Sequence, residues 1–374
     1  MKMRVNTLRE ALEILKPVVP KKPTLPVLTN ILLGEGRAEA IDLETAVSLD
    51  IEEADGKCLM PLSPVLDLLK RVPGNELLTI EQKGKHLKLT WSDGSASFDV
   101  DDPDDYPGFP EVKAKPQKRV DGDTLVPALS SLLRYCATEE SRPVLTGVIL
   151  FLGENLEIAA GDGFRMAYKS LPINLIIQGR VNAIIPAQAI RYLAHLWAKT
   201  PREAPSGDSI AQIAVSKRMV DLTFHEDKDN AKLKVGFGRV TMVTKLVQGQ
   251  PPNMKQLLPK EPGPQVKIMA MDLERAARGI VAPARDNSGI VRLAWAEKSM
   301  TVSAKSDNKG SIETFIPVET DEPGKVALNV NYLLEYLHGK EGLITMATSS
   351  EKAPILFRHS ASPLVLLMPM NVQW

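Results

Sequence analysis

Basic side chains recur at helical spacing in this sequence. Arg191, His195 and Lys199 lie four residues apart, which places them on one stripe of a helix. Lys70 and His338 occupy the position of His195 in two similar segments. Cations in such a stripe attract phosphate groups without reading bases. The pattern predicts either a shared cationic surface or ordinary solvated helix faces, and its recurrence favours the surface.

Motifs for catalysis and for metal binding are absent from the sequence. None of the histidines is followed by a histidine or cysteine three or four residues later, so a zinc site is not expected. There is no phosphate-binding loop ending in Gly-Lys-Ser or Gly-Lys-Thr, and no Gly-x-Ser-x-Gly turn. The acidic run at residues 99–105 lacks the glycine and final glutamate of a calcium loop, which favours a solvated linker. We therefore expect no catalytic residue, no metal and no cofactor.

The composition is that of a globular protein. The 374 residues include 46 Lys and Arg and 46 Asp and Glu, with 44% hydrophobic and 25% charged residues, which excludes a disordered chain. Zero net charge excludes a globally basic nucleic-acid binder but allows a local positive face. No segment approaches the ~18 apolar residues of a membrane span, and the N-terminus lacks the apolar run of a signal peptide. With only Cys58 and Cys136, we expect a reduced, cytoplasmic protein without a membrane partner.

The elements that would position the cations repeat along the chain. Three segments place apolar residues at relative positions 0, 3, 4 and 7, the buried face of an amphipathic helix. The three sets are Leu8, Ala11, Leu12 and Leu15; Leu125, Ala128, Leu129 and Leu132; and Leu273, Ala276, Ala277 and Ile280. One such set indicates a helix, whereas three with the same order of small and large residues indicate a repeated unit.

The segments that follow these helices also repeat. Residues 26–33 and 143–150 are similar Pro-Val-Leu-Thr segments, residues 289–293 correspond more loosely, and each predicts an apolar strand entered through a turn. A second helix follows in every unit, with apolar residues at 0, 3 and 4. Those sets are Val65, Leu68 and Leu69; Ile190, Leu193 and Ala194; and Leu333, Tyr336 and Leu337. Residues 87–91 and 219–224 alternate as strands do.

Segments rich in proline separate the predicted units. Residues 101–122 combine proline with charge, and residues 249–265 carry five prolines, so both are poor candidates for regular structure. We therefore predict an α+β protein with three similar tandem domains, at residues 1–120, 121–258 and 259–374.

At this point the motifs resemble a known family, the bacterial DNA polymerase III beta subunit or sliding clamp. Residues 22–28, Lys-Pro-Thr-Leu-Pro-Val-Leu, resemble the family's Arg-Pro-Thr-Leu-Pro-Ile-Leu, and residues 42–44 resemble part of its Thr-Asp-Leu-Glu. Residues 161–167, Gly-Asp-Gly-Phe-Arg-Met-Ala, are similar to its Thr-Asp-Gly-His-Arg-Leu-Ala. Residues 329–334 and the Met-Pro-Met at 368–370 match later motifs, so the resemblance spans the chain.

The resemblance implies a homodimer ring of six similar domains around double-stranded DNA, with helices lining the hole and antiparallel sheets outside. Weak phosphate contacts would let the ring slide without sequence specificity. Matched position makes Lys22 and Arg142 candidate DNA contacts, while periodicity alone adds Arg191 and Lys199. Because no nucleotide-binding motif is present, a separate ATP-driven clamp loader would place the ring on DNA.

The family also implies a pocket, between the second and third domains, for short peptide motifs of the replicative polymerase, the clamp loader and repair and translesion proteins. Apolar clefts accept Leu or Phe anchors, and flexible methionines adapt to different peptides. Carried over by position, the pocket comprises Leu145, Gly161, Gly163, Phe164, Arg165, Met166, Pro252, Gln256, Leu257, Leu366, Met368, Pro369 and Met370.

The sequence departs from the family at this pocket. Gly161 stands where the family has Thr, Phe164 where it has His, and Gln256 where it has Arg. The tail at residues 371–374 runs past the family's usual end. We expect a more apolar pocket with altered peptide preference, and Trp374 near its rim.

Two other readings of the sequence stay open. An enzyme of tandem α/β repeats could use carboxylates such as Asp42 and Asp162, and a repeat scaffold could bind proteins only. For the dimer contacts, Tyr106 and Phe109 on one edge and the helix of Ile280 on the other are the expected residues. Retention on closed circular DNA would separate a clamp from both alternatives.

Overall fold

The computed structural model groups the chain into two compact units. The first comprises Met1–Ser130 and Ile173–Gln248, and the second comprises Ser131–Pro172 and Gly249–Trp374. The structure describes residues 1–112, 114–139, 141–200, 218–225, 230–259, 263–306, 310–360 and 362–373. Among these residues no helix is long and apolar enough to cross a membrane.

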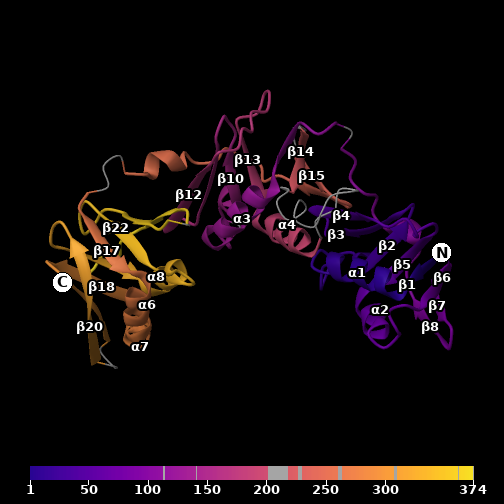
Figure 1. The fold of residues 1–374 in the computed structure, drawn as a ribbon, viewed down its shortest axis with the longest axis horizontal. Coiled ribbons are helices and arrows are strands. Elements are labelled where there is room, and N and C mark those ends of the chain that lie inside the picture. The colour runs from indigo at the N-terminus through magenta and orange to yellow at the C-terminus, as the bar shows by residue number, and fades with distance from the viewer. Residues whose placement is uncertain are drawn as a thin grey trace, which may run out of the picture. The chain divides into compact units, whose positions relative to one another are not determined.

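The helices of the first unit bury the faces that the apolar spacing predicts. In α1 (Val5–Leu15), Leu8, Leu12 and Leu15 are fully buried, because a 3.6-residue period brings them to one side. Helix α2 (Leu62–Leu69) packs beside α1, as Figure 1 shows in indigo and violet. Helix α4 (Ala187–Lys199), which follows β13 (Asn182–Pro186), also contacts α1.

Two antiparallel sheets complete the first unit. The smaller has the order β1 (Lys2–Arg4), β6 (Leu77–Lys83), β7 (His86–Trp91) and β8 (Gly94–Asp99). The larger has the order β5 (Lys57–Pro61), β2 (Asn30–Gly34), β3 (Arg37–Ile41), β4 (Thr45–Asp50), β16 (Val240–Lys245), β15 (Lys232–Phe237), β14 (Met219–His225) and β9 (Lys118–Asp121). Pairing of β4 with β16 therefore joins segments almost 200 residues apart in the chain.

The second unit carries a continuous run of eleven antiparallel strands among its described residues. Their order is β10 (Gly147–Phe151), β11 (Leu156–Gly161), β12 (Arg165–Leu171), β24 (Leu364–Leu367), β23 (Ile355–Arg358), β22 (Leu343–Ala347), β17 (Gln265–Met269), β20 (Gly310–Thr320), β19 (Ser299–Ser306), β18 (Ile290–Ala296) and β21 (Gly324–Asn329). Helices α6 (Ala270–Gly279), α7 (Val281–Asp286) and α8 (Val330–Leu337) pack together and against these strands, in the orange and yellow part of Figure 1.

The repeated helices and strand entries are confirmed. The set beginning at Leu125 lies in α3 (Gly122–Leu132), and the set beginning at Leu273 lies in α6 apart from Ile280, which directly follows that helix; every member of both sets is buried. The Pro-Val-Leu segments form the short 3-10 helices η1 (Pro26–Thr29) and η4 (Pro143–Leu145), which lead into β2 and β10. The α+β class with antiparallel sheets is therefore correct.

Several expectations need correction. The segment at 101–122 contains η2 (Pro103–Asp105) and β9, and the segment at 249–265 contains η5 (Met254–Leu257), so neither is wholly irregular. Tyr106 is only 6% exposed, and its hydroxyl donates to the carbonyls of Asn30 and Glu39 at 3.4 Å. The expectation that Tyr106 lies on a free dimer edge is wrong, because the first unit itself buries the ring.

Candidate functional site

A tight turn of four residues, from Asp162 to Arg165, lies between β11 and β12. The Oδ1 atom of Asp162 accepts hydrogen bonds from the backbone N–H groups of Phe164 at 2.9 Å and Arg165 at 3.0 Å. The Asp162 N–H donates to the Arg165 carbonyl at 3.2 Å. Gly163 has a φ of 94°, a left-handed conformation that glycine adopts without a Cβ clash. The Asp-Gly sequence therefore shapes the turn.

Strand pairing brings the C-terminal strand to this turn. Arg165 of β12 is paired with Leu367 of β24, and Met166 with Leu366. One residue beyond the ladder, the Met368 N–H donates to the Phe164 carbonyl at 2.8 Å. Residues about 200 positions apart are thereby held side by side by backbone hydrogen bonds.

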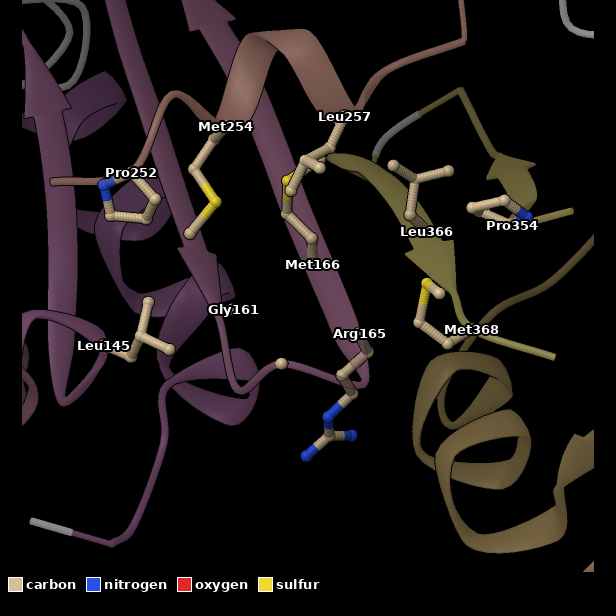
Figure 2. A pocket seen from close by; sticks show the side chains of 11 residues that line it. Leu145, Gly161, Arg165, Met166, Pro252, Met254, Leu257, Pro354, Leu366 and Met368 are labelled. Carbon is tan, nitrogen blue, oxygen red and sulfur yellow. The ribbon is translucent and has the colours of Figure 1, made fainter. Parts of the chain in front are cut away.

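An apolar cavity of about 300 Å³ opens beside this strand pair. Figure 2 shows Leu145, Met254 and Leu257 on one side of it and Leu366, Met368 and Pro354 on the other. Nine of the thirteen predicted pocket residues line it, namely Leu145, Gly161, Gly163, Arg165, Met166, Pro252, Leu257, Leu366 and Met368. Apart from Arg165, the side chains of the lining are apolar.

The other four predicted residues lie outside this lining. Phe164, which is 62% exposed, lines a neighbouring, more polar cavity together with Arg142 and Tyr332. Gln256 is exposed on η5. Pro369 and Met370 continue past β24, where the Met370 N–H donates to the Ala327 carbonyl at 2.8 Å. The expectation that these four share one lining with the others is therefore not met.

Met254 and Pro354 line the cavity although the sequence motifs did not point to them. Met254 is 3% exposed, and a Cβ placed on Gly161 would come within 3.3 Å of its Cε atom. The apolar spacing of Met254 and Leu257 on one short turn is the signal that could have indicated the first. Lys255, on the same turn, is fastened by an ion pair with Glu157 of β11 at 2.5 Å.

Arg165 ties the turn to α8. Its side chain is 9% exposed, with Nε donating to Asp162 Oδ2 at 2.9 Å, one Nη bonding Glu335, and the other Nη donating to the Arg134 carbonyl at 2.6 Å. Burial by itself would lower the pKa of Arg165, but the hydrogen bonds that Arg165 donates to Glu335 and Asp162 outweigh this effect and raise the pKa. In Figure 2 the guanidinium points away from the methionines, so only the stem of Arg165 borders the cavity.

Two models of one protein family match the chain. The family model described as "DNA polymerase III beta subunit, N-terminal domain" matches residues 1–110, and the one described as "DNA polymerase III beta subunit, central domain" matches residues 120–253. The chain belongs to the DNA polymerase III beta subunit family. Its function is that of a DNA sliding clamp in replication.

Relatives of this clamp are similar along almost the whole chain. The beta sliding clamp of Synechococcus elongatus is 24% identical, covering 99% of this chain and 96% of its own, and that of Synechocystis is 26% identical, covering 95% and 94%. The solved beta subunit of Thermotoga maritima superimposes with a TM-score of 0.84 at 18% identity, covering 100% and 99%. A clamp from Bartonella birtlesii, solved bound to griselimycin, gives 0.86 at 20% identity, with coverage of 100% and 99%.

The four predicted DNA-contact residues of this clamp are exposed cations. Lys22 precedes η1, Arg142 precedes η4, and Arg191 and Lys199 lie on α4. Within the described parts of the chain, none of the four is ion-paired. His195 differs from its two neighbours in the stripe, because it is half-buried and its Nε2 has no described hydrogen-bond partner.

Other basic residues of the repeated clamp helices are neutralised locally. Lys70 pairs with Asp67 at 2.7 Å, Arg275 with Asp272 at 2.9 Å and Arg278 with Glu274 at 2.6 Å. Such pairs within one helix cancel charge near the surface. Fewer unpaired positive charges therefore remain on these helices than the recurrence of basic residues indicated.

Both carboxylates considered for an enzyme are engaged in hydrogen bonds. Asp162 is held by its turn and by Arg165, as described above. Asp42 Oδ1 accepts from the N–H groups of Glu44 and Thr45, and its Oδ2 accepts from the Tyr192 hydroxyl at 2.8 Å. Among the described residues, no three His, Cys, Asp or Glu side chains gather as a metal site would require. Trp374, expected near the pocket rim, lies outside the described residues.

Proposed function

We propose that two copies of this chain close head to tail into a ring that encircles double-stranded DNA. Each copy would contribute three similar domains, at residues 1–120, 121–258 and 259–374. The recurrence of buried helix faces in α1, α3 and α6 supports this division, because each has the same order of small and large buried residues. Topology would retain the ring, so phosphate contacts can stay weak enough for sliding.

Lys22, Arg142, Arg191 and Lys199 are the proposed phosphate contacts. Their exposure and their lack of described carboxylate partners support this role. Four point charges of this kind attract any duplex equally and read no base edges. The DNA would therefore pass through without a preferred position.

The cavity beside β12 and β24 is the proposed docking site for short peptides of the replicative polymerase, the clamp loader and repair and translesion proteins. Its apolar lining suits one or two apolar anchors, and three of its lining residues are methionines whose flexible side chains adapt to different shapes. Phe164 borders the adjacent polar cavity, where it would contact the rest of a bound peptide. The apolar cavity is the observation that carries this assignment.

The chain itself would catalyse no reaction, and a separate ATP-driven loader would open the ring on chromosomal DNA in the cytoplasm. The engagement of Asp42 and Asp162 in their own turns supports a structural role for both.

Retention on circular DNA tests the ring. The full-length chain, loaded by its clamp loader and ATP onto nicked circular DNA, should co-elute with the DNA after gel filtration and should be released when one restriction cut linearises the circle. Equal retention before and after the cut would contradict encirclement. A protein scaffold or an enzyme would show no dependence on closed topology.

Peptide binding tests the docking site. A fluorescein-labelled hexapeptide ending in Leu-Phe should bind the full-length clamp in an anisotropy titration, and Met368→Glu should weaken binding at least tenfold, because it puts a charge into the apolar cavity. Met271→Glu is the matched control, since Met271 is 62% exposed on α6 and does not line the cavity. Equal loss in both variants would contradict the assignment.

A further inference from the structure

The turn that builds the cavity of the second unit recurs in the first. Asp42 Oδ1 accepts from the N–H groups of Glu44 at 3.0 Å and Thr45 at 2.6 Å, and the Asp42 N–H donates to the Thr45 carbonyl at 3.0 Å. These are the same hydrogen bonds that Asp162 makes with its own turn. Strand β4 then pairs with β16, as β12 pairs with β24.

The register of the two strand pairs is also the same. Thr45 lies opposite Thr244, as Arg165 lies opposite Leu367. One residue beyond, the Lys245 N–H donates to the Glu44 carbonyl at 2.9 Å, as the Met368 N–H donates to the Phe164 carbonyl at 2.8 Å. Lys245 therefore occupies the position of Met368.

A second cavity, of about 160 Å³, lies at this equivalent place in the first unit. Its apolar lining includes Ile41, Ala46, Pro107 and Val243. Val243 is paired with Ala46 as Leu366 is paired with Met166. Equivalent strand positions therefore line each of the two cavities. None of the described residues in this lining is aromatic.

The two cavities differ in charge. Lys232 lies directly opposite Lys245 in the pairing of β15 with β16, and both line the cavity. In the second unit the corresponding residues are Pro354 and Met368, one step beyond the Ile355–Leu367 pair. Like charges directly opposite each other are unfavourable without an anion nearby. Glu44 pairs with Lys245 at 3.1 Å, and Lys232 has no ion-pair partner among the described residues.

Leu43 adds an unusual backbone conformation to this site. It lines the cavity with a φ of 75°, where the equivalent residue of the other turn is Gly163. A bulky residue in the left-handed region costs ~1 kcal/mol or more relative to glycine. Its side chain is nevertheless 42% exposed, so burial recovers little of that cost. Leu43 therefore contributes an exposed apolar side chain to the lining of this cavity.

We propose that this cavity is a second peptide-docking site, which takes an acidic segment with an apolar anchor. The anchor would rest on Val243 and Ala46 under the Leu43 side chain, and the acidic residues would neutralise the Lys232–Lys245 pair. A peptide fits better than single-stranded nucleic acid, because bases stack on aromatic rings and this lining has none. The site is independent of the cavity that contains Met368.

Anisotropy titrations of the full-length clamp test the proposal. The probes are three fluorescein-labelled hexapeptides with Leu-Leu, Ile-Leu or Phe-Leu between flanking Asp-Glu pairs. All titrations use the Met368→Glu background, which should weaken peptide binding at the other cavity. At least one probe should bind, Lys232→Gln with Lys245→Gln should weaken it at least tenfold, and Leu43→Gly should weaken it at least threefold. Glycine suits the backbone at position 43, so this variant keeps the turn.

The outcomes separate the proposal from its alternatives. Absence of binding by all three probes, or unchanged binding by the double glutamine variant, would overturn it. Tighter binding of a fluorescein-labelled decathymidine, lost in the same double variant, would also overturn it in favour of nucleic acid. In NMR spectra, the Leu43 methyl signals should shift when the probe is added, but not when its lysine-flanked counterpart is added. This result would support the peptide site without relying on any charge variant. Retention on nicked circular DNA should be unchanged in the double variant, so loss of the clamp function itself would be recognised separately.

Discussion

The Arg165 guanidinium lies over the ring of Tyr332, 4.4 Å from its centroid. Tyr332 belongs to α8 and Arg165 begins β12, so this stacking joins a helix to a strand more than 160 residues earlier. The ring of Tyr135 approaches the same guanidinium at 5.5 Å. Cation–π contacts of this kind strengthen with desolvation, and here the Arg165 side chain is 9% exposed while Tyr332 is half-buried.

Replacing Arg165 should therefore be costly. Arg165→Met keeps the stem but leaves Asp162, whose side chain is 15% exposed, without its partner. We expect a loss of about 2–4 kcal/mol in the free energy of unfolding, measured by urea denaturation, because a mostly buried carboxylate becomes unpaired.

Arg275→Met is the matched control for this change. Its ion pair with Asp272 has the same 2.9 Å length and the same three-residue spacing, but Arg275 is 80% exposed. A surface pair contributes only ~0.5 kcal/mol, so this variant should unfold almost as the parent does. Similar losses in the two variants would contradict a special role for Arg165.

Adding side-chain volume at Gly161 should narrow the cavity. A Cβ there would lie 3.3 Å from Met254 Cε and 3.1 Å from the Arg165 carbonyl, so Gly161→Thr must displace the methionine into the cavity. We expect the affinity for a peptide with a Phe anchor to fall about tenfold in an anisotropy titration. Gly279→Thr is the control, because nothing lies within 4 Å of a Cβ at that position. If the affinity of Gly161→Thr equals that of the parent, the cavity does not hold the anchor.

Removing a DNA-contact cation should change the salt dependence of binding. We expect Lys22→Ala, Arg142→Ala, Arg191→Ala or Lys199→Ala each to reduce the slope of log affinity against log salt by about 0.9 for a short duplex, because one fewer counterion is released. The thermal unfolding midpoint should stay within ~1 °C, because these side chains are exposed. Lys298→Ala, an exposed lysine outside the predicted set, should leave the slope unchanged. A slope unaltered in all four variants would remove them from the DNA surface.

Stability should depend on pH through Lys340. Burial, together with the positive charge of Arg134, lowers the pKa of Lys340 to about 8. An unfolded lysine has a pKa of about 10.4, so between these values the unfolded chain binds a proton that the folded chain does not. The contribution of Lys340 to stability therefore rises with pH across that window. Tyr336, whose ring lies 4.3 Å from Lys340 Nζ, stays neutral there because burial raises its pKa.

A comparison with Lys340→Met isolates this effect. The difference in unfolding free energy between parent and variant should shift in favour of the parent as the pH rises from 8 to 10, measured by urea denaturation at each pH. A difference that stays constant with pH would show that Lys340 titrates normally.

Local spacing was sufficient to predict the helices. Leu8, Leu125 and Leu273 are buried as expected, because the 3.6-residue period of a helix depends on neighbouring residues only. The burial of Tyr106 was not predictable in this way. Its hydroxyl reaches carbonyls of β2 and β3 that lie more than 60 residues earlier.

By itself the sequence determined the repeated helices and strands, the family and most of the residues around the apolar cavity. Tertiary structure alone decided that Met254 and Pro354 complete that cavity. It also decided that Arg165 forms ion pairs with Asp162 and Glu335, and that Lys232 lies opposite Lys245. The physical reason is the same in each case. Strand pairing and side-chain burial join residues from distant parts of the chain, and no periodicity along the sequence encodes which of them will meet.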